Sequence, residues 1–216
     1  MPTVSPTPDS VPVHVAAFDF DGTLTQGDSL LPFLWRSLGW LGFARALILS
    51  SPWLVAYALR LMSNYRAKAR LLQVSLAGSH QTEIQRHADD FVTRYLPAQW
   101  NTWARQQLLD HQQQGHRCVI VSASPGIYLH AMAASIGIHD VLCTEMELVD
   151  ETFTGLMATP NCHGEEKVIR LQSWLDATLG KHAKLVLYAY GDTSGDKPML
   201  RLAQQAWYRG VPWSSP

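Results

Sequence analysis

Cysteine and charge are both scarce in this sequence. Its 216 residues include three cysteines, Cys118, Cys143 and Cys162, an odd number without the paired spacing of a disulfide framework or a zinc knuckle. A reducing compartment, and hence a cytoplasmic location, is therefore expected. Charged residues make up 16% of the chain and almost cancel, which leaves a formal net charge of −1. No basic cluster is interleaved with aromatic residues, and this argues against nucleic-acid binding.

The first residues also lack the apolar segment of a secretion signal. Residues 1–12 are rich in proline, serine and threonine, and we expect a disordered lead there. Apolar residues are plentiful elsewhere: they make up 47% of the chain, enough to bury a sizeable core. The length fits one domain, or one domain with a large insertion.

Short apolar runs alternate with helical stretches along much of the sequence. The runs predicted to be strands are 13–18, 117–122, 141–144, 184–190 and, more weakly, 206–209. The stretches predicted to be helices are 98–114, 125–136, 165–179 and 194–204. This alternation predicts an α/β fold with a Rossmann-like, doubly wound parallel sheet, whose strands are apolar because helices cover both faces.

Two segments interrupt this alternation. Residues 28–97 have little strand character and predict an all-helical cap, inserted as a lid into a core formed by residues 13–27 and 98–216. The helices expected in the cap are 30–62, 64–76 and 81–96, the last with Ser79 as its N-cap. The second segment, 145–156, predicts a β-hairpin with an acidic tip that extends the sheet.

Two carboxylates follow the first predicted strand directly. Asp19 and Asp21 lie at positions i and i+2, followed by Gly22 and Thr23. An extended chain would send the two side chains to opposite faces. They can serve one site only if the chain coils sharply after Asp19, and Gly22 permits such a turn. This arrangement suits a nucleophilic carboxylate beside a separate acid/base carboxylate.

Three further polar segments are expected near the same sheet edge, where open α/β sheets bind ligands. One is the loop Ser122-Ala123-Ser124, which offers hydroxyls and the start of a helix. Another places Lys167 in the first turn of a helix, where a cation is unfavourable unless it faces an anion. The third brings Asp192 and Asp196 to the end of another strand. Carboxylates gathered in this way, next to a phosphate, favour Mg²⁺ over zinc.

In their order along the chain, these segments resemble the four motifs of the haloacid dehalogenase (HAD) superfamily, in its phosphoserine phosphatase-like branch, subfamily IB. Asp19–Thr23 matches DxDGT, Ser122 the motif II serine, Lys167 the motif III lysine, and Gly191–Asp196 matches GDxxxD. The helical insertion after the first motif is similar to the cap of that branch.

The resemblance implies a role for each residue. Asp19 would attack phosphorus and form an aspartyl-phosphate, and Asp21 would be the general acid and base. Asp19, Asp192 and the backbone carbonyl of Asp21 would bind Mg²⁺, with Asp196 as a further ligand or an orienting group. Ser122 and Lys167 would hold the phosphoryl oxygens. The remaining residues assigned to shaping the turn or binding substrate are Gly22, Thr23, Ala123, Ser124, Asp28 and Arg70.

The cap residues leave the substrate open. Asp28 stands near a position where serine-phosphate relatives have a glutamate, and it could instead cap the next helix. Arg70 could grip a substrate anion, or be a solvated arginine beside Arg66 and Lys68. The cap is unusually apolar, so it either packs its own core, accepts an apolar substrate, or makes peripheral contact with a membrane.

The expected activity is therefore Mg²⁺-dependent hydrolysis of a phosphate monoester, either a small phosphoserine-like metabolite or an apolar ester. The alternatives are a lipid phosphate phosphatase of the phosphatidylglycerophosphatase type and a phosphotransferase or phosphomutase. A further alternative is a membrane-associated binding module that keeps the fold without the chemistry. The sequence does not predict an oligomeric state.

Overall fold

The computed structural model describes residues 11–214, so residues 1–10 of the predicted disordered lead lie outside the described residues. The strands are β1 (Val13–Phe18), β2 (Arg117–Pro125), β3 (Asp140–Thr144), β4 (Met146–Val149), β5 (Thr152–Met157), β6 (Leu185–Gly191), β7 (Gln205–Tyr208) and β8 (Val211–Trp213). The helices are α1 (Leu30–Ala58), α2 (Asn64–Leu76), α3 (Gln81–Asp90), α4 (Thr102–Gln113), α5 (Gly126–Ser135), α6 (Glu165–Leu179) and α7 (Lys197–Leu202). Short helical turns are η1 (Phe20–Leu24), η2 (Phe91–Tyr95) and η3 (Leu96–Gln99).

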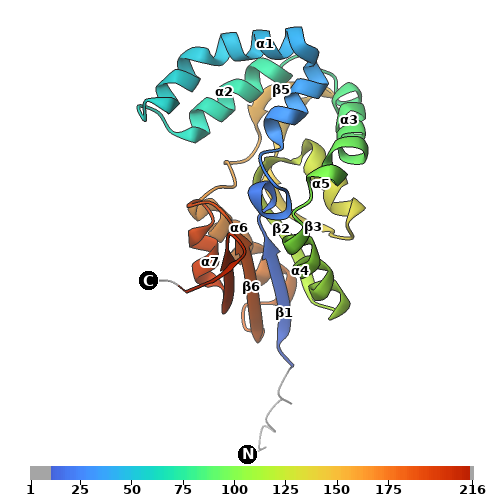
Figure 1. Cartoon of the computed structure of the whole chain (residues 1–216), viewed down its shortest axis with the longest axis vertical. Helices are drawn as coiled ribbons and strands as arrows, with labels where there is room; N and C mark the ends of the chain where they lie inside the picture. Colours follow the sequence, from blue (N-terminus) through green and yellow to red (C-terminus); the bar gives the residue numbers. More distant parts are fainter. Residues whose placement is uncertain (1–10, 215–216) are drawn as a thin grey trace, which may run out of the picture.

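The central sheet has β1 in its middle. Over residues 11–214 it contains six strands in the order β3-β2-β1-β6-β7-β8, and only the pairing of β8 with β7 is antiparallel. The chain builds outward from β1 through β2 to β3, and then on the other side through β6 to β7 (Figure 1). This confirms the predicted doubly wound α/β fold. It also places a crevice at the carboxyl end of β1, where the strand order reverses.

Both faces of the sheet are buried. Along β1, Val15 and Ala17 pack with residues of α6 and α7, such as Leu171. Ala16 and Phe18 belong to the core on the opposite face, with residues of α4 and α5. These four side chains of β1 are completely buried, as expected for a parallel strand covered on both sides. The central strand is thus a fixed support for the residues at its carboxyl end.

A helical layer, α1 to α3, lies beyond that end of the sheet (Figure 1). Its base is fixed to α5 by aromatic packing, since Phe33, Phe91 and Tyr128 contact one another with ring centroids 4.9 to 5.5 Å apart. Burial of each such ring stabilises the fold by about 2 kcal/mol or more. The layer is therefore joined to the core at one end, and α1 and α2 extend from it.

The first helix of this layer is not continuous in direction. Gly39 has φ 65° and ψ 177°, which are not helical values, and φ in this region favours glycine. The break separates a first segment, whose Phe33 and Leu34 are buried, from a longer second segment that runs alongside α2. The predicted helix 30–62 ends earlier than expected, at Ala58, and it contains Pro52.

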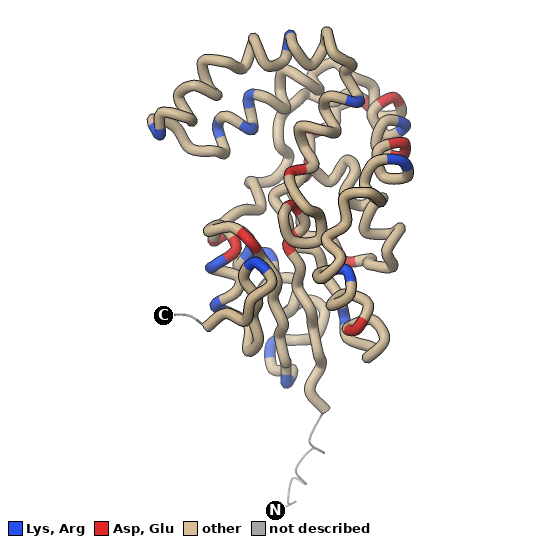
Figure 2. The backbone as a smooth tube through the Cα atoms, in the orientation of Figure 1, with Lys and Arg blue, Asp and Glu red and all other residues tan. Residues whose placement is uncertain are grey.

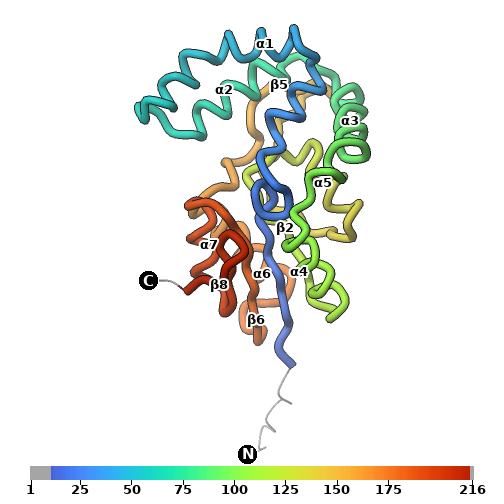
Figure 3. Tube along the Cα trace, viewed as in Figure 1, coloured from blue at the N-terminus to red at the C-terminus, as the bar shows by residue number. Residues whose placement is uncertain are grey.

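The hairpin β4–β5 corrects one expectation. It forms a two-stranded sheet of its own and does not extend the central sheet. Its strand β5 packs instead against α2 (Figure 3), where Gly155 touches the backbone of Gln73 so closely that a side chain would not fit. The amide of Gly78 donates to the carbonyl of Phe153 at 2.9 Å. The acidic tip alone did not reveal that this hairpin supports the helical layer.

The same contact explains why the predicted N-cap of α3 was wrong. The carbonyl of Ser79 accepts a hydrogen bond from the amide of Phe153, so the chain at Ser79 is bonded to strand β5 of the hairpin. The N-cap is His80, whose Nδ1 accepts from the amide of Thr82 at 3.3 Å. Other boundaries also shift: β2 continues to Pro125, α4 begins at Thr102 after Asn101 as N-cap, and β8 was not predicted.

Candidate active site

The turn η1 brings both acids of the first motif to one side of the chain. Asp19 is extended (φ −67°, ψ 162°), and the chain then coils through Asp21 to Gly22, which has φ 77°. A Cβ atom on Gly22 would collide with the carboxylate of Asp192, so the turn requires glycine both for its backbone angle and for space. Asp19 and Asp21 consequently line the same cavity.

Lys167 is the centre of a buried charge network. Its Nζ donates to Oδ1 of Asp19 at 2.6 Å and to Oδ1 of Asp196 at 2.5 Å, and all three side chains are less than 10% exposed. Burial alone would lower the pKa of Lys167, but the two carboxylates outweigh it and raise that pKa. The lysine is therefore charged at neutral pH. Its position in the first turn of α6 is explained by these two anions.

The two partners of Lys167 differ in their protonation. Burial raises the pKa of Asp19 to about 7, although Lys167 opposes this. Burial also acts to raise the pKa of Asp196, but attraction to Lys167 and hydrogen bonds from Lys167 and Thr193 outweigh it and lower that pKa. Asp196 is thus a permanent anion, while Asp19 needs a further cation to be fully ionised at neutral pH.

Three carboxylates at this point could hold a metal ion. Oxygens of Asp19, Asp192 and Asp196 lie within 4.8 Å of one another. The carboxylate of Asp196 is already hydrogen-bonded within the protein. Its Oδ2 accepts from the amides of Asp192 and Thr193 and from the Thr193 hydroxyl. Among the described residues, the side-chain carboxylate of Asp192 accepts only a 3.2 Å hydrogen bond from Thr23. Burial, followed by the nearby Asp196, raises the pKa of Asp192. An all-oxygen set of this kind suits a hard cation such as Mg²⁺.

The second acid has a different environment. Oδ1 of Asp21 accepts from the amide of Ser29 at 2.9 Å, and Oδ2 accepts a short hydrogen bond from the hydroxyl of Ser124. Burial raises the pKa of Asp21 to about 6, and these two hydrogen bonds limit the rise. A carboxyl group with this pKa exchanges a proton near neutral pH, which is what acid/base catalysis needs.

The loop after β2 closes the site from the other side. The Oγ of Ser122 accepts from the amide of Ser124 at 3.1 Å, and the Ser122 side chain faces the cavity. The carbonyl of Ala123 accepts from Nζ of Lys68, on α2, at 2.6 Å. A direct contact therefore joins this loop to the helical layer across the cavity.

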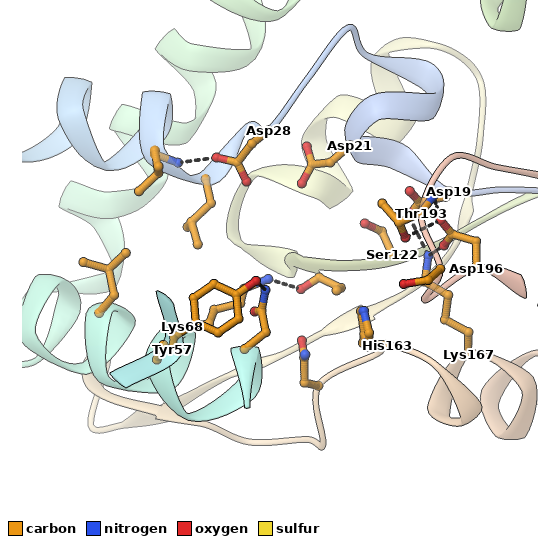
Figure 4. A pocket seen from close by; sticks show the side chains of 18 of the residues that line it. Asp19, Asp21, Asp28, Tyr57, Lys68, Ser122, His163, Lys167, Thr193 and Asp196 are labelled. Atoms are coloured by element: carbon orange, nitrogen blue, oxygen red, sulfur yellow. Dashed lines mark hydrogen bonds and ion pairs between the residues drawn. The ribbon is translucent and has the colours of Figure 1, made fainter. Parts of the chain in front are cut away.

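The cavity itself has a volume of about 470 Å³ and two chemically different ends. Figure 4 shows Asp19, Lys167, Asp196 and Thr193 together at one end, and Asp28, Lys68 and Tyr57 toward the other. Apolar side chains from α1 and α2 line the second end; these are Leu30, Leu31, Leu54, Ala67 and Leu71. A molecule bound here would have its anionic group among the acids and lysine, and its remainder between α1 and α2.

Comparison with known proteins places this arrangement in a family. Residues 16–201 match the family model of haloacid dehalogenase-like hydrolases. The chain belongs to the haloacid dehalogenase-like hydrolase family. It is 32% identical over 205 residues to protein CicA of Caulobacter vibrioides, a match that covers 90% of this chain and 85% of that one. The expectation of a HAD-type hydrolase is thus confirmed.

Solved structures of the HAD fold agree with the architecture. A Bordetella pertussis protein of unknown function superposes with a TM-score of 0.76 at 22% identity, covering 91% of this chain and 89% of that one. A phosphoserine phosphatase in apo form superposes with a TM-score of 0.61 at 14% identity, covering 91% of this chain and 86% of that one. The resemblance to the phosphoserine phosphatase-like branch of the HAD superfamily therefore holds at the level of fold.

The structure gathers most of the residues that the HAD motifs predicted for the site, but not all of them in the predicted place. Asp19, Asp21, Ser122, Ala123, Lys167 and Asp196 line the main cavity. Asp192 lies beside it with Gly22 and Thr23, which shape the turn and hold Asp192 and do not line that cavity. The hydroxyl of Ser124 donates a hydrogen bond to the carboxylate of Asp21. Asp28 lines the cavity, and its Oδ2 accepts from the amide of Leu31 at 3.0 Å, although the N-cap residue of α1 is Ser29.

Arg70 is a correction, because it does not line the cavity. Its guanidinium donates to Gln73 at 3.0 Å and lies over the ring of Trp53, 4.7 Å from the centroid. The cation of α2 that lines the cavity is Lys68, two residues earlier and hence about 160° round the helix from Arg70. A signal was available: Lys68 shares its helix face with Asn64 and Leu71, at spacings of four and three residues. Tyr57, Asn161 and His163 were also not predicted.

A second group of metal-type ligands lies away from the HAD site. Atoms of His130, Cys143 and Glu145 are within 4.8 Å of one another. They are satisfied without a metal, since Glu145 accepts from His130 at 2.8 Å and from the Cys143 thiol at 3.1 Å. The hydrogen bond with Glu145 raises the pKa of His130, and burial raises that of Cys143. In this group a histidine and a carboxylate are hydrogen-bonded to each other beside a protonated thiol.

Proposed function

We propose that this chain is a Mg²⁺-dependent phosphomonoesterase that forms an aspartyl-phosphate on Asp19. The observation that carries the proposal is the buried Asp19–Lys167–Asp196 network at the end of a cavity that Asp21 also lines. A nucleophile, a cation and a separate proton donor are what phosphoryl transfer requires.

The first half of the reaction uses the two acids in turn. A carboxylate oxygen of Asp19 forms a bond to phosphorus as the bond from phosphorus to the ester oxygen breaks. Asp21, with a pKa of about 6, gives its proton to the leaving oxygen. In the second half, Asp21 takes a proton from water, whose oxygen attacks phosphorus and releases inorganic phosphate and free Asp19. Lys167 and the hydroxyl of Ser122 would hold the phosphoryl oxygens.

Asp19 and Asp192 fit a divalent cation better than Asp196 does. Asp196 is saturated by Lys167, by Thr193 and by the amide of Asp192, so it would orient the other groups from outside. The backbone carbonyl of Asp21 would be a further ligand, as the HAD motif implies. When bound, Mg²⁺ would supply positive charge that offsets the negative charge on the phosphoryl group.

Metal removal tests this assignment. We expect purified protein to hydrolyse p-nitrophenyl phosphate with Mg²⁺ and to lose activity by at least about a hundredfold in excess EDTA, with recovery on addition of Mg²⁺. Ca²⁺, which prefers more ligands and longer bonds, should restore much less of the activity than Mg²⁺ does. Full activity in EDTA would contradict the proposed metal role.

The leaving group is proposed to be an apolar or amphiphilic alcohol. Five of the cavity residues from α1 and α2 are apolar aliphatic side chains, and Tyr57 joins them. A small phosphoserine-like metabolite remains the second candidate, because Lys68 and Asn64 also line that end and could bind polar groups. A lipid-like phosphate ester uses the whole cavity and is favoured by this lining. The cytoplasmic location stays a prediction, consistent with three free cysteines.

Lys68 and Arg70 offer a matched pair for testing which cation serves the site. The Lys68→Met variant should raise KM for a phosphate ester by about tenfold or more, because a cation that faces Asp21 and the bound anion is lost. Arg70→Met, which removes the same charge from the same helix, should leave KM within about twofold of wild type. Steady-state kinetics of both variants check this. An equal effect of the two substitutions would contradict the assignment of Lys68.

A further inference from the structure

The second segment of α1 presents an apolar stripe to solvent. Leu41, Ile48 and Val55 follow one another at spacings of seven residues, which places them on one face of the helix, and Leu59, the C-cap residue, follows four residues later. Their exposed fractions lie between 56% and 70%. Ala46 and Ser50, on another face of this segment, are buried. The stripe therefore has no partner within the described residues, whereas the face that carries Ala46 and Ser50 does.

The whole helix is unusual for a soluble core element. It is the one helix in residues 11–214 that is long and apolar enough to cross a membrane, yet only 11% of its most apolar window is buried. Trp35 and Trp40, on either side of the Gly39 break, are 50% and 66% exposed. Tryptophan combines a large apolar ring with a polar N–H and favours the interface between hydrocarbon and water.

The charge around the stripe has a single sign. Residues 29–82 contain six cations, Arg36, Arg45, Arg60, Arg66, Lys68 and Arg70, and no aspartate or glutamate, although the whole chain has a net charge of −1. Figure 2 shows basic residues along α1 and α2 and acidic residues only beyond them, toward α3 and the core. Arg45, Arg60 and Arg66 are exposed. The surface is therefore both apolar and positive.

We propose that the outer face of α1, with Arg45, Arg60 and Arg66, binds the surface of an anionic lipid bilayer. Apolar side chains and tryptophans would enter the interface, and the arginines would attract acidic headgroups. In Figure 1 α1 is the outermost element, at the end of the molecule opposite β1's first residue, so a flat surface can reach it without obstruction.

Two other arrangements are less compatible with the same residues. A second copy of the chain, packed symmetrically on this face, would place arginines against arginines with no acid in residues 29–82 to offset them. A membrane-spanning helix would have to leave α2, expose Ser50 and Ala46, and carry Arg45 and Pro52 into hydrocarbon. A helix that lies flat in the interface keeps its contacts with α2.

The cavity lies on the other side of α1 from the stripe. Leu31 and Tyr57 are both 44% exposed and line the apolar end of the cavity. Tyr57 is two residues from Val55, which places it on the opposite side of the helix. Binding to the bilayer therefore does not rest on the proposed function.

Vesicle sedimentation with the full chain tests the proposal. The vesicles contain phosphatidylcholine alone, or equal parts of phosphatidylcholine and phosphatidylglycerol. Wild-type protein should sediment with the anionic vesicles and at least about tenfold less with the neutral ones. The Ile48→Glu/Val55→Glu variant should lose binding by more than about tenfold, because two charges enter the apolar stripe. Each of Arg45→Gln and Arg60→Gln should weaken it about fivefold.

A matched control separates a specific surface from a general effect of charge. Ile169→Glu/Val211→Glu also places two acids at exposed apolar positions, on α6 and β8, and should bind like wild type. All variants should hydrolyse p-nitrophenyl phosphate at the wild-type rate, so loss of that activity would count against the proposed function or the fold and not against membrane binding.

Several results would overturn the proposal. Failure of wild-type protein to bind anionic vesicles is one, and equal loss in both double-glutamate variants is another. A dimer in light scattering that Ile48→Glu/Val55→Glu dissociates would make a second copy the occupant. Resistance of vesicle-bound protein to alkaline carbonate extraction would indicate a spanning helix.

Discussion

Replacing Asp19 by asparagine should reduce phosphatase activity by about four to six orders of magnitude, the scale seen when a catalytic nucleophile is removed. The amide oxygen of asparagine can still accept the hydrogen bond of Lys167, and Asp196 still balances its charge, so the variant should fold. Residual activity would come from water attacking the bound ester directly. Initial rates with p-nitrophenyl phosphate and Mg²⁺, at matched protein concentration, give the ratio.

Two controls make this result specific to Asp19. Asp176→Asn, at an exposed position of α6, makes the same chemical change without touching the site and should keep wild-type activity. Wild-type protein quenched in acid during turnover should carry a phosphoryl group on the peptide that contains Asp19. Hydrolysis by Asp19→Asn at more than about a hundredth of the wild-type rate would show that another group is the nucleophile.

Replacing Lys167 by methionine should lower the free energy of unfolding by about 3–5 kcal/mol, because the change leaves two buried carboxylates without their shared cation. For a chain of this length the melting temperature would fall by about 10 °C or more. Activity should fall as well, since the same ammonium would offset charge on the phosphoryl group. Urea unfolding followed by circular dichroism measures the stability.

The loss of stability in Lys167→Met should depend on pH in a defined direction. Asp19 has a raised pKa, about 7, so its ionisation already costs stability as pH rises from near 4 toward 7. Without Lys167 that pKa rises further, and the cost continues to accumulate above pH 7. The variant should therefore be closer to wild type at pH 6 than at pH 8. Lys181→Met, an exposed substitution, should differ little from wild type at either pH.

The residues at the ends of the central strands were predictable from the sequence. Apolar strands leading into Asp19 and into Asp192 place both acids at one sheet edge by topology alone, and the glycine at position 22 indicated a sharp turn. Lys167 could also be anticipated, since a cation in a helix's first turn needs a nearby anion. These inferences depend on local chain geometry and on strand order, which short motifs encode well.

The helical layer was less predictable for a physical reason. The face of α2 that turns toward the cavity depends on how this helix packs against α1 and β5. The packing of α2 on β5 joins residues that are far apart in sequence. Arg70 and Lys68 are equally basic and two positions apart, so composition could not distinguish them. The hairpin shows the same limit, because strands β4 and β5 can be recognised locally while their docking on α2 cannot.

The central position of β1 has a consequence for how the chain folds as it is synthesised. Val15 pairs with Arg117 and Leu187, both of which emerge from the ribosome much later than Val15 does. At the usual rates of translation, β1 waits on the order of ten seconds or more for β6. During that time an apolar strand with two unpaired edges is exposed, and the helices after it can form first. Nascent chains of this protein are therefore expected to need a chaperone that shields β1 until the ribosome has delivered the last of its neighbours.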